Sequence, residues 1–414
     1  MDRNDYCIDI SQDKISISDE LLIPIFSGVK KLIDTLPLFN ELDLDLIELL
    51  AHARRFRAFQ DVIVFGTGGS CLSGKMYATF KDATGPKMHF VDNVDPYEWN
   101  RLMNAISPQT TGIVVISKSG NTTETLCQTF MALRQWENVP EHFLFVTDPG
   151  ENALREIAEH DGITCLDHPI GIGGRFSGFS VVGLLPALIA GVDAKDVLHG
   201  ASEVMCAFLQ HGPFESNPVL ASAYWQNDLF LKGINMSVLF CYAERLHPFA
   251  EWYRQLWSES LGKKDNYAPD CGENCKRYGT TPVVSLGTID QHSQLQLYVD
   301  GPRDKFFTIV AVGDHPKTEP VSIGGVSNFI SRALDGHTMA ELFVTHQQVT
   351  QQTLVENGNP TRNIFIPEFN ERSLGQLMMF SILETLALAC IWRIDPFNQP
   401  GVKFGKDRVI ALMR

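Results

Sequence analysis

Short apolar runs alternate with longer stretches of mixed polar and apolar residues from residue 61 onward. The runs are rich in valine, isoleucine and phenylalanine, which favours β-strands, and they lie at Val62–Phe65, Met88–Asp92, Gly112–Ser117, Phe143–Thr147 and Ile163–Leu166. The stretches between them are long enough to form helices. This alternation predicts βαβ units, and hence a parallel sheet covered by helices on both faces.

A second series of the same kind follows a polar break. The break is Gln210–Asn217, and the next apolar runs are Ser237–Tyr242, Pro282–Leu286 and Phe306–Val312. Helical patterns dominate from about Asn328. We therefore predict an α/β protein with two doubly wound parallel-sheet domains of three layers each. The first is residues 1–210 with an N-terminal helical segment, the second is 211–345, and a helical C-terminal tail follows at 346–414.

Two longer apolar runs could be mistaken for membrane spans. Phe176–Val192 contains Pro186 and is short for a span, and Leu374–Ile394 carries Glu384 in its middle, which lipid would disfavour. We predict that both are buried core helices.

Charge and composition narrow the possible partners. The chain has 414 residues, with 34 Lys and Arg against 49 Asp and Glu, a formal net charge of −15. A chain this acidic is expected to repel nucleic acid and anionic membranes. The N-terminal sequence MDRNDYCIDIS has neither the basic nor the apolar region of a signal peptide, so we expect a cytoplasmic location.

The cysteines indicate free thiols rather than a disulfide framework. There are nine, an odd number, without framework spacing. Cys271 and Cys275 could form one half of a metal site, but no second pair or histidine cluster stands nearby at ligand spacing. We therefore predict no metal site.

The first glycine-rich turn, Gly66–Ser70, directly follows an apolar run. Glycines at a strand-to-helix turn let the backbone approach a ligand closely, and the following helix N-terminus offers free N–H groups. A dinucleotide site would use such a turn with an acid after the next strand, and Asp92 is available. That motif also needs a glycine at position 71, where this chain has Cys71. A tight turn without any ligand is equally compatible with this loop.

A second loop, Ser117–Thr125, carries stronger chemistry. Its sequence SKSGNTTET places hydroxyls, a lysine and a glycine at the entry of a predicted helix. Hydroxyl donors, backbone N–H groups and the helix dipole would converge there, which suits a phosphate dianion. A threonine helix cap would produce part of the same pattern, and both can hold at once.

These two loops resemble those of the sugar isomerase (SIS) fold, which binds phosphosugars. Four further stretches resemble motifs of the glucose-6-phosphate isomerase family: GGRFSGFSVVGLLP (Gly173–Pro186), QLWSESLGK (Gln255–Lys263), GTIDQHSQLQL (Gly287–Leu297) and FNQPGVKFGK (Phe397–Lys406). All six stand in the family's order across residues 62–406. The last stretch departs from the family at Pro400 and Lys403, where Trp and Glu are usual.

The resemblance implies an aldose–ketose isomerase that interconverts glucose 6-phosphate and fructose 6-phosphate in glycolysis and gluconeogenesis. Ring opening would precede an enediolate intermediate, which needs both a base and a cation. By resemblance, Glu259 is the base, Arg175 the cation at the enediolate oxygens, and His292 the ring-opening acid with Lys406 as its partner. The resemblance implies no cofactor and no metal, since Arg175 supplies the positive charge.

The substrate contacts carried over from the family come from both loops and the later motifs. They are Gly69, Ser70, Ser117, Lys118, Ser119 and Thr122 around the phosphate, and Glu124, Gln255 and Gln399 around the sugar. Gln255 and Glu259 lie four apart on a predicted helix and hence share one face. We expect the pocket where strand ends of the two domains meet, completed by the C-terminal tail.

The family also implies a homodimer in which His292 is shared across the interface. Two alternatives remain: a dual phosphoglucose/phosphomannose isomerase, and a non-catalytic phosphosugar-binding SIS regulator. A regulator would need the phosphate loops but not Glu259, Arg175, His292 and Lys406 together. A nucleotide-dependent dehydrogenase is disfavoured by Cys71.

Overall fold

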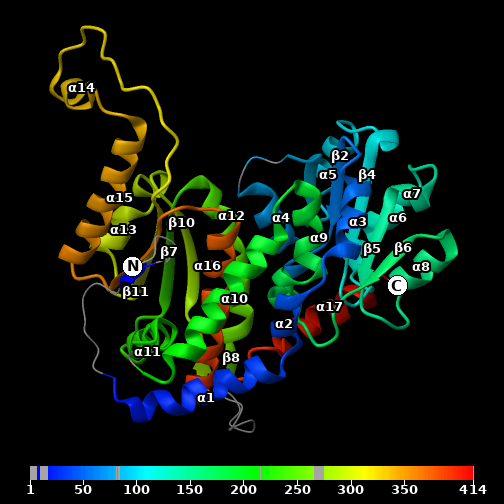
Figure 1. Cartoon of the computed structure of the whole chain (residues 1–414), viewed down its shortest axis with the longest axis horizontal. Coiled ribbons are helices and arrows are strands. Elements are labelled where there is room, and N and C mark those ends of the chain that lie inside the picture. The colour runs from blue at the N-terminus through cyan, green and yellow to red at the C-terminus, as the bar shows by residue number, and fades with distance from the viewer. Residues whose placement is uncertain are drawn as a thin grey trace.

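The computed structural model describes residues 7–9, 17–80, 82, 84–214, 216–264 and 275–413. Two five-stranded sheets stand apart, with a layer of helices between them (Figure 1). A small two-stranded ribbon, β8 (Lys263–Lys264) and β9 (Arg277–Tyr278), accompanies them.

The first sheet is entirely parallel. Its order is β3 (Lys87–Val91), β2 (Asp61–Phe65), β4 (Thr111–Ile116), β5 (Phe143–Thr147) and β6 (Thr164–Asp167). Both faces are covered, so the central strands β2, β4 and β5 are apolar at most positions. The outer face packs on α5 (Pro96–Met103), α6 (Thr123–Leu133) and α8 (Ala153–Asp161). The inner face packs on α3 (Ile47–Phe56), α4 (Gly69–Thr79) and α9 (Val181–Ala190).

The second sheet has one antiparallel edge strand. Its order is β1 (Cys7–Asp9), β12 (Thr361–Ile366), β11 (Lys305–Val312), β7 (Met236–Tyr242) and β10 (Thr281–Leu286), and only β1 runs against its neighbour. One face packs on α13 (Leu295–Asp300) and α15 (Met339–Glu356). The other faces α12 (His247–Leu261) and α16 (Glu371–Trp392).

The remaining described elements are short connectors and helices around these layers. They are α1 (Asp19–Thr35), α2 (Pro37–Asn40), η1 (Glu41–Asp43), η2 (Pro108–Thr110), α7 (Val139–His142), η3 (Gly174–Phe179), α10 (Ala194–His211), α11 (Pro218–Leu231), η4 (Glu244–Leu246), η6 (Ile289–Gln291), α14 (Phe329–Leu334) and α17 (Pro400–Leu412).

The strands predicted from both apolar series are confirmed, but the predicted tail is not purely helical. It contains β12, which pairs with β11 in the second sheet. At the other end of the chain, β1 also pairs with β12 and so belongs to the second sheet rather than the first. The domain boundaries at 210 and 345 stay predictions.

The two long apolar runs are core helices, as predicted. All ten residues of α9 are buried. By length and composition α16 could cross a membrane, yet 89% of its most apolar window is buried inside the protein. Within it, Glu384 forms a buried ion pair with Arg362 of β12, and Ser222 donates a further hydrogen bond to the carboxylate. These partners satisfy the one acidic residue that would be costly in an apolar layer.

The expectation of free thiols holds for Cys71, Cys127, Cys165, Cys206, Cys241 and Cys390, and fails at Cys275. Cys275 is disulfide-bonded, and Cys271, the other cysteine of the rejected metal pair, lies outside the described residues. Among the residues described, no group of three or more His, Cys, Asp or Glu side chains could hold a metal.

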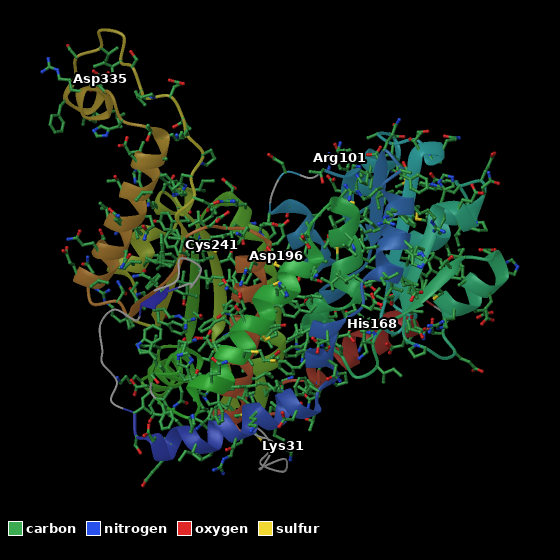
Figure 2. All side chains as sticks on the ribbon, in the orientation of Figure 1. Lys31, Arg101, His168, Asp196, Cys241 and Asp335 are labelled. Carbon is green, nitrogen blue, oxygen red and sulfur yellow. The ribbon has the colours of Figure 1, made fainter. Side chains whose placement is uncertain are left out.

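One segment projects from the body of the second sheet. We call residues 315–338, between β11 and α15, the arm. It extends away from the sheet and carries α14 at its far end, where Figure 2 also labels Asp335 (Figures 1 and 2). Phe329 and Ile330 on α14 are 87% and 69% exposed. An isolated arm with apolar side chains on its surface is typical of a contact between protein chains.

Candidate active site

Glu259 lies in the last turn of α12 and receives hydrogen bonds from three side chains. Gln255 donates to Oε1 at 3.0 Å, while Arg175 and Gln399 donate to Oε2 at 3.1 and 2.7 Å. The spacing of four between Gln255 and Glu259 therefore brings both onto one face, as predicted. A carboxylate oxygen accepts about two hydrogen bonds in its plane, so Oε1 keeps a lone pair that no described residue occupies. The glutamate side chain is 31% exposed, which leaves it open to a ligand.

Arg175 is the most deeply buried charge in this group. Its side chain is 0% exposed, and its donors go to Ser260 Oγ at 2.8 Å, to Glu259, and to the backbone carbonyl oxygens of Pro396 and Asn398. Burial lowers the pKa of Arg175, and the Glu259 carboxylate opposes that effect. Because an arginine starts above pH 12, the guanidinium remains a fixed cation.

The glycine loop at 66–70 is positioned by close contact with two other motifs. A Cβ on Gly69 would lie 2.1 Å from the carbonyl carbon of Gly174, and one on Gly68 would lie 2.7 Å from Gln255 Nε2. Gly68 also has φ +54°, which favours glycine. Glycine at these positions is therefore required for the loop to pack against the Arg175 turn and α12. Ser70 follows in the first turn of α4.

The loop Ser117–Thr122 follows the neighbouring strand β4. It lies beside the glycine loop, since a Cβ on Gly66 would contact the Ile116 carbonyl oxygen at 3.1 Å. Ser117 donates to Thr122 Oγ1 at 3.0 Å, and Gly120 has φ +62°. The Lys118 carbonyl accepts from Asp148 N at 2.9 Å, which ties the loop to the end of β5.

The side chains of this second loop suit an anion. Ser119 is exposed and Lys118 is half-buried. Within the described part of the chain, no hydrogen bond or ion pair of the Lys118 ammonium is found. The helix α6 begins directly after the loop, and Glu124 in its first turn is exposed and accepts from Thr123 Oγ1 at 2.8 Å. A free cation, hydroxyls and a helix N-terminus therefore meet at one edge of the sheet.

The two sheets contribute to this region differently. The loops extend from the carboxyl ends of β2 and β4 in the first sheet. Glu259 instead lies near the amino end of β10 in the second, because Trp257 Nε1 donates to Thr280 Oγ1 at 2.8 Å. A cavity of about 580 Å³ opens beside it, lined by Glu259, Gly262, Lys263, Tyr278, Asn398 and Gln399 among others.

One predicted catalytic residue, His292, is not joined to this group within a single chain. His292 is exposed, and its neighbour Asp290 interacts electrostatically with His247 at the start of α12. Glu259 is in the last turn of that helix, about 18 Å along its axis. Lys406 lies on α17, but its side chain is outside what the structure describes.

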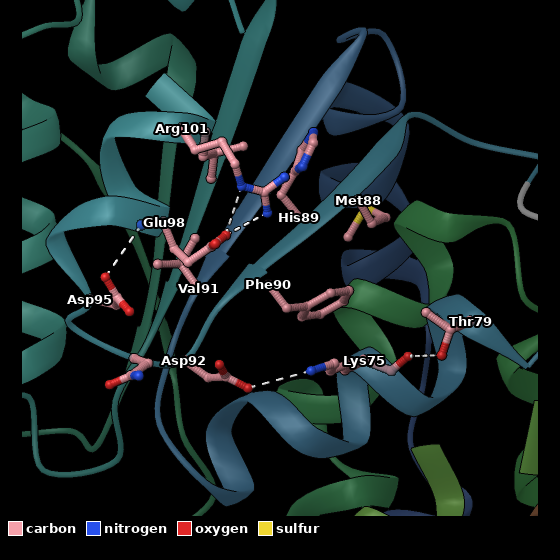
Figure 3. Close-up of a pocket in the computed structure, with 12 residues that line it drawn as sticks. Lys75, Thr79, Met88, His89, Phe90, Val91, Asp92, Asp95, Glu98 and Arg101 are labelled. Carbon is pink, nitrogen blue, oxygen red and sulfur yellow. Dashed lines mark hydrogen bonds and ion pairs between the residues drawn. The ribbon is translucent and has the colours of Figure 1, made fainter. Parts of the chain in front are cut away.

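A second cavity of about 540 Å³ lies at the edge of the first sheet, between α4, β3 and α5 (Figure 3). Its lysine and arginine are already paired, Lys75 with Asp92 at 3.7 Å and Arg101 with Glu98 at 2.9 Å. Paired cations offer less to an incoming phosphate than the free Lys118.

Lys263 and Asn398 were not singled out from the sequence. Lys263 donates to the backbone oxygen of Asn398 and to its Oδ1 atom, the latter at 3.2 Å. The signals in the sequence were the position of Lys263 at the end of the QLWSESLGK motif and that of Asn398 in the FNQPGVKFGK motif.

Comparisons with known proteins show the family of the chain. The family profile described as phosphoglucose isomerase matches residues 50–413. The glucose-6-phosphate isomerase of Rubrobacter xylanophilus is 34% identical over 370 residues, covering 85% of this chain and 82% of the relative. A glucose-6-phosphate isomerase of Thermus thermophilus is 34% identical over 371 residues, covering 87% and 86%.

Solved structures share the fold. A hypothetical protein from Thermus thermophilus has a TM-score of 0.86 at 30% identity, covering 99% of this chain and 100% of that one. A glucose-6-phosphate isomerase from Chlamydia trachomatis has a TM-score of 0.72 at 22% identity, covering 98% and 81%.

Two mainly parallel sheets, two loops at the carboxyl ends of strands in the first sheet, and a carboxylate held by a guanidinium define a protein of the SIS phosphosugar isomerase class. Within that class, the chain belongs to the phosphoglucose isomerase family.

Proposed function

We propose that the protein interconverts glucose 6-phosphate and fructose 6-phosphate, as an enzyme of glycolysis and gluconeogenesis. The observation that carries this proposal is the Glu259 carboxylate, which is held by Arg175, Gln255 and Gln399. Among the described residues, its Oε1 atom accepts one hydrogen bond and so keeps a lone pair for a proton. Such a group can accept a proton from carbon and return it. The family and the named relatives support the same reaction.

The phosphate would bind at the Ser117–Thr122 loop with Ser70. Lys118 supplies charge, and the hydroxyls and backbone N–H groups supply directed donors. Binding there anchors the end of the sugar that does not react. Gln255, Gln399 and Glu124 would then orient the hydroxyl groups.

In the open-chain sugar, Glu259 removes the proton from the carbon next to the carbonyl group. From glucose 6-phosphate this is the C2 proton, and its electron pair moves toward C1–C2 while negative charge develops on O1. Arg175 stabilises that charge, because its cation is preorganised and needs no rearrangement. The hydroxyl proton on O2 passes to O1, and Glu259 then delivers its proton to C1 as the C2–O2 carbonyl group forms, which gives the ketose. Atoms and charge balance without an external oxidant.

Ring opening requires an acid, and His292 is our candidate, contributed by a second copy of the chain. Two observations support a homodimer. His292 is exposed at the other end of α12 from Glu259, and the preceding Gln291 donates to the His346 carbonyl oxygen and to Thr350 of α15. The arm, with its exposed Phe329 and Ile330, leads directly into α15. In this proposal, a two-fold contact through the arm brings His292 to the partner's site. Lys406 would assist at the ring oxygen.

The experiment is a coupled assay of purified protein with fructose 6-phosphate, with and without a chelator. Formation of glucose 6-phosphate that is insensitive to chelation is the expected result for a cytoplasmic, metal-independent isomerase. Mannose 6-phosphate as a second substrate tests the dual-specificity alternative. Binding of fructose 6-phosphate without turnover would instead indicate a phosphosugar-binding regulator.

A further inference from the structure

The segment that delivers Gln399 to Glu259 is fixed by two buried cations. The segment is Asp395–Gln399, directly before α17. Arg175 donates to the Pro396 and Asn398 carbonyl oxygens, and Lys263 donates to both the carbonyl oxygen and Oδ1 of Asn398. Both donors therefore converge on one residue, and Gln399 is the next residue along the chain.

Lys263 is placed for this contact by the small ribbon that follows α12. It lies in β8, paired with Tyr278 of β9, and is 8% exposed. A nearly buried lysine loses much of its hydration, so its hydrogen bonds must compensate. Its two acceptors both belong to Asn398, which is 135 residues away in the sequence.

We propose that Lys263 is a positioning residue of the isomerase site, which holds Asn398 so that Gln399 can orient the Glu259 carboxylate. The inference rests on the proposed function. Lys263 does not act on the substrate; it acts through Asn398 and Gln399. Its ammonium holds Asn398 in the C-terminal segment, next to Gln399, whereas Arg175 of η3 contacts the Glu259 carboxylate directly.

The charges around Lys263 make this support sensitive to pH. Burial and the Arg175 cation lower the pKa of Lys263 to about 8, while Asp395 and Glu259 oppose the shift. Arg277 and Tyr278 of β9 and Lys264 of β8 line the same cavity. When the ammonium loses its proton, the hydrogen bonds to Asn398 are no longer charge-assisted and weaken.

The lowered pKa also has a consequence for stability. An unfolded chain binds the Lys263 proton up to about pH 10.4, so between pH 8 and that value the unfolded state holds more protons than the folded state. Stability contributed by this group therefore rises with pH across that window. Below pH 8 the buried Lys263 cation lowers the free energy of unfolding. Replacement of Lys263 by an uncharged residue is therefore expected to leave the melting temperature unchanged or higher.

The test compares K263M with a matched control, K305M. Lys305 is 6% exposed and donates to the Pro302 carbonyl at 3.3 Å and to Asp304, so it is another buried lysine that holds backbone. For K263M we expect kcat with fructose 6-phosphate to fall about tenfold, with KM within about threefold and no loss of melting temperature. For K305M we expect a lower melting temperature and kcat within about twofold of the wild type.

A double mutant separates positioning from general damage. If Lys263 acts through Gln399, then K263M/Q399A should be about as slow as Q399A alone. Three results would overturn the inference without affecting the isomerase function. The first is a double mutant whose loss of kcat is the product of the two single losses. The others are a K263M enzyme with wild-type kcat and a K305M enzyme that loses as much kcat as K263M. A wild type without isomerase activity would overturn both.

The pH profile provides an independent readout that does not depend on the folding of K263M. Wild-type kcat should fall as the pH rises through about 8, and K263R, whose guanidinium stays charged, should keep its kcat to about pH 9.5. A wild-type kcat that is flat to pH 9.5, or a K263R profile identical to the wild type, would overturn the inference.

Discussion

The Oε2 atom of Glu259 and the Nη1 atom of Arg175 lie 3.1 Å apart, although 84 residues separate them in the sequence. One residue ends a helix of the second half of the chain, and the other lies in a short turn of the first half. The glycine at position 69 makes this possible, because its backbone touches the turn that carries Arg175. Base and cation are therefore held together before substrate arrives, which lowers the reorganisation needed during the reaction.

Replacement of Glu259 by glutamine should remove the base with little change in shape. We expect E259Q to lower kcat by at least about 10²-fold, since an amide cannot take up the proton. Steady-state kinetics with fructose 6-phosphate measures the effect. The matched control is E251Q on the same helix, whose carboxylate pairs with Arg254. Near-normal turnover by E259Q would mean that another residue moves the proton.

Arg175 should not be replaceable by lysine. A lysine has one terminal nitrogen, whereas Arg175 contacts Ser260, Glu259 and two backbone carbonyl groups through three. We expect R175K to lower kcat by about 10²-fold and the free energy of unfolding by about 1–3 kcal/mol, because buried acceptors lose partners. Kinetics and denaturant titration measure the two effects. R254K, at an exposed pair, is the control; a fully active R175K would remove the cation from the mechanism.

Ser119 tests the phosphate loop. A carboxylate at this exposed position would face the substrate dianion, so S119D should raise KM by about tenfold or more, with a smaller effect on kcat. S119N has the same shape without the charge and should raise KM less. Equal KM values for the two variants would place the phosphate elsewhere.

Subunit mixing tests the shared His292. In a heterodimer of E259Q and H292A, one site would carry both lesions and the other neither. With random exchange at equal mixing, half of the dimers are mixed, so about a quarter of all sites should recover activity. Mixtures that exchange subunits, as shown by mass, yet remain inactive would show that each chain forms its site alone.

The strands could be predicted where burial on both sides produces an almost continuous apolar run, as in Val62–Phe65 and Gly112–Ser117. Strand β12 was missed because its sequence TRNIFI begins with polar residues. Arg362 is buried there only because Glu384 pairs with it from a helix 22 residues further on, and such a partner is invisible to a local pattern.

The site was predicted through motifs, which name residues but not their contacts. The four-residue spacing of Gln255 and Glu259 was enough to place them together. By contrast, Gln399 reaches Glu259 across 140 residues, and Lys263 reaches Asn398 across 135. Those contacts depend on the packing of both halves and could not be derived from spacing.

The fate of hydrogen at the sugar carbons tests most directly whether Glu259 moves a proton between C1 and C2. Fructose 6-phosphate is incubated in D₂O with wild type or E259Q, and the product is followed by NMR. We predict that the wild type forms glucose 6-phosphate with deuterium at C2 in at least part of the product, because a protonated carboxyl group can exchange with solvent before it returns the proton. E259Q should form none above the uncatalysed background. Wild-type conversion without any deuterium at C2, or equal conversion by E259Q, would contradict this role for Glu259.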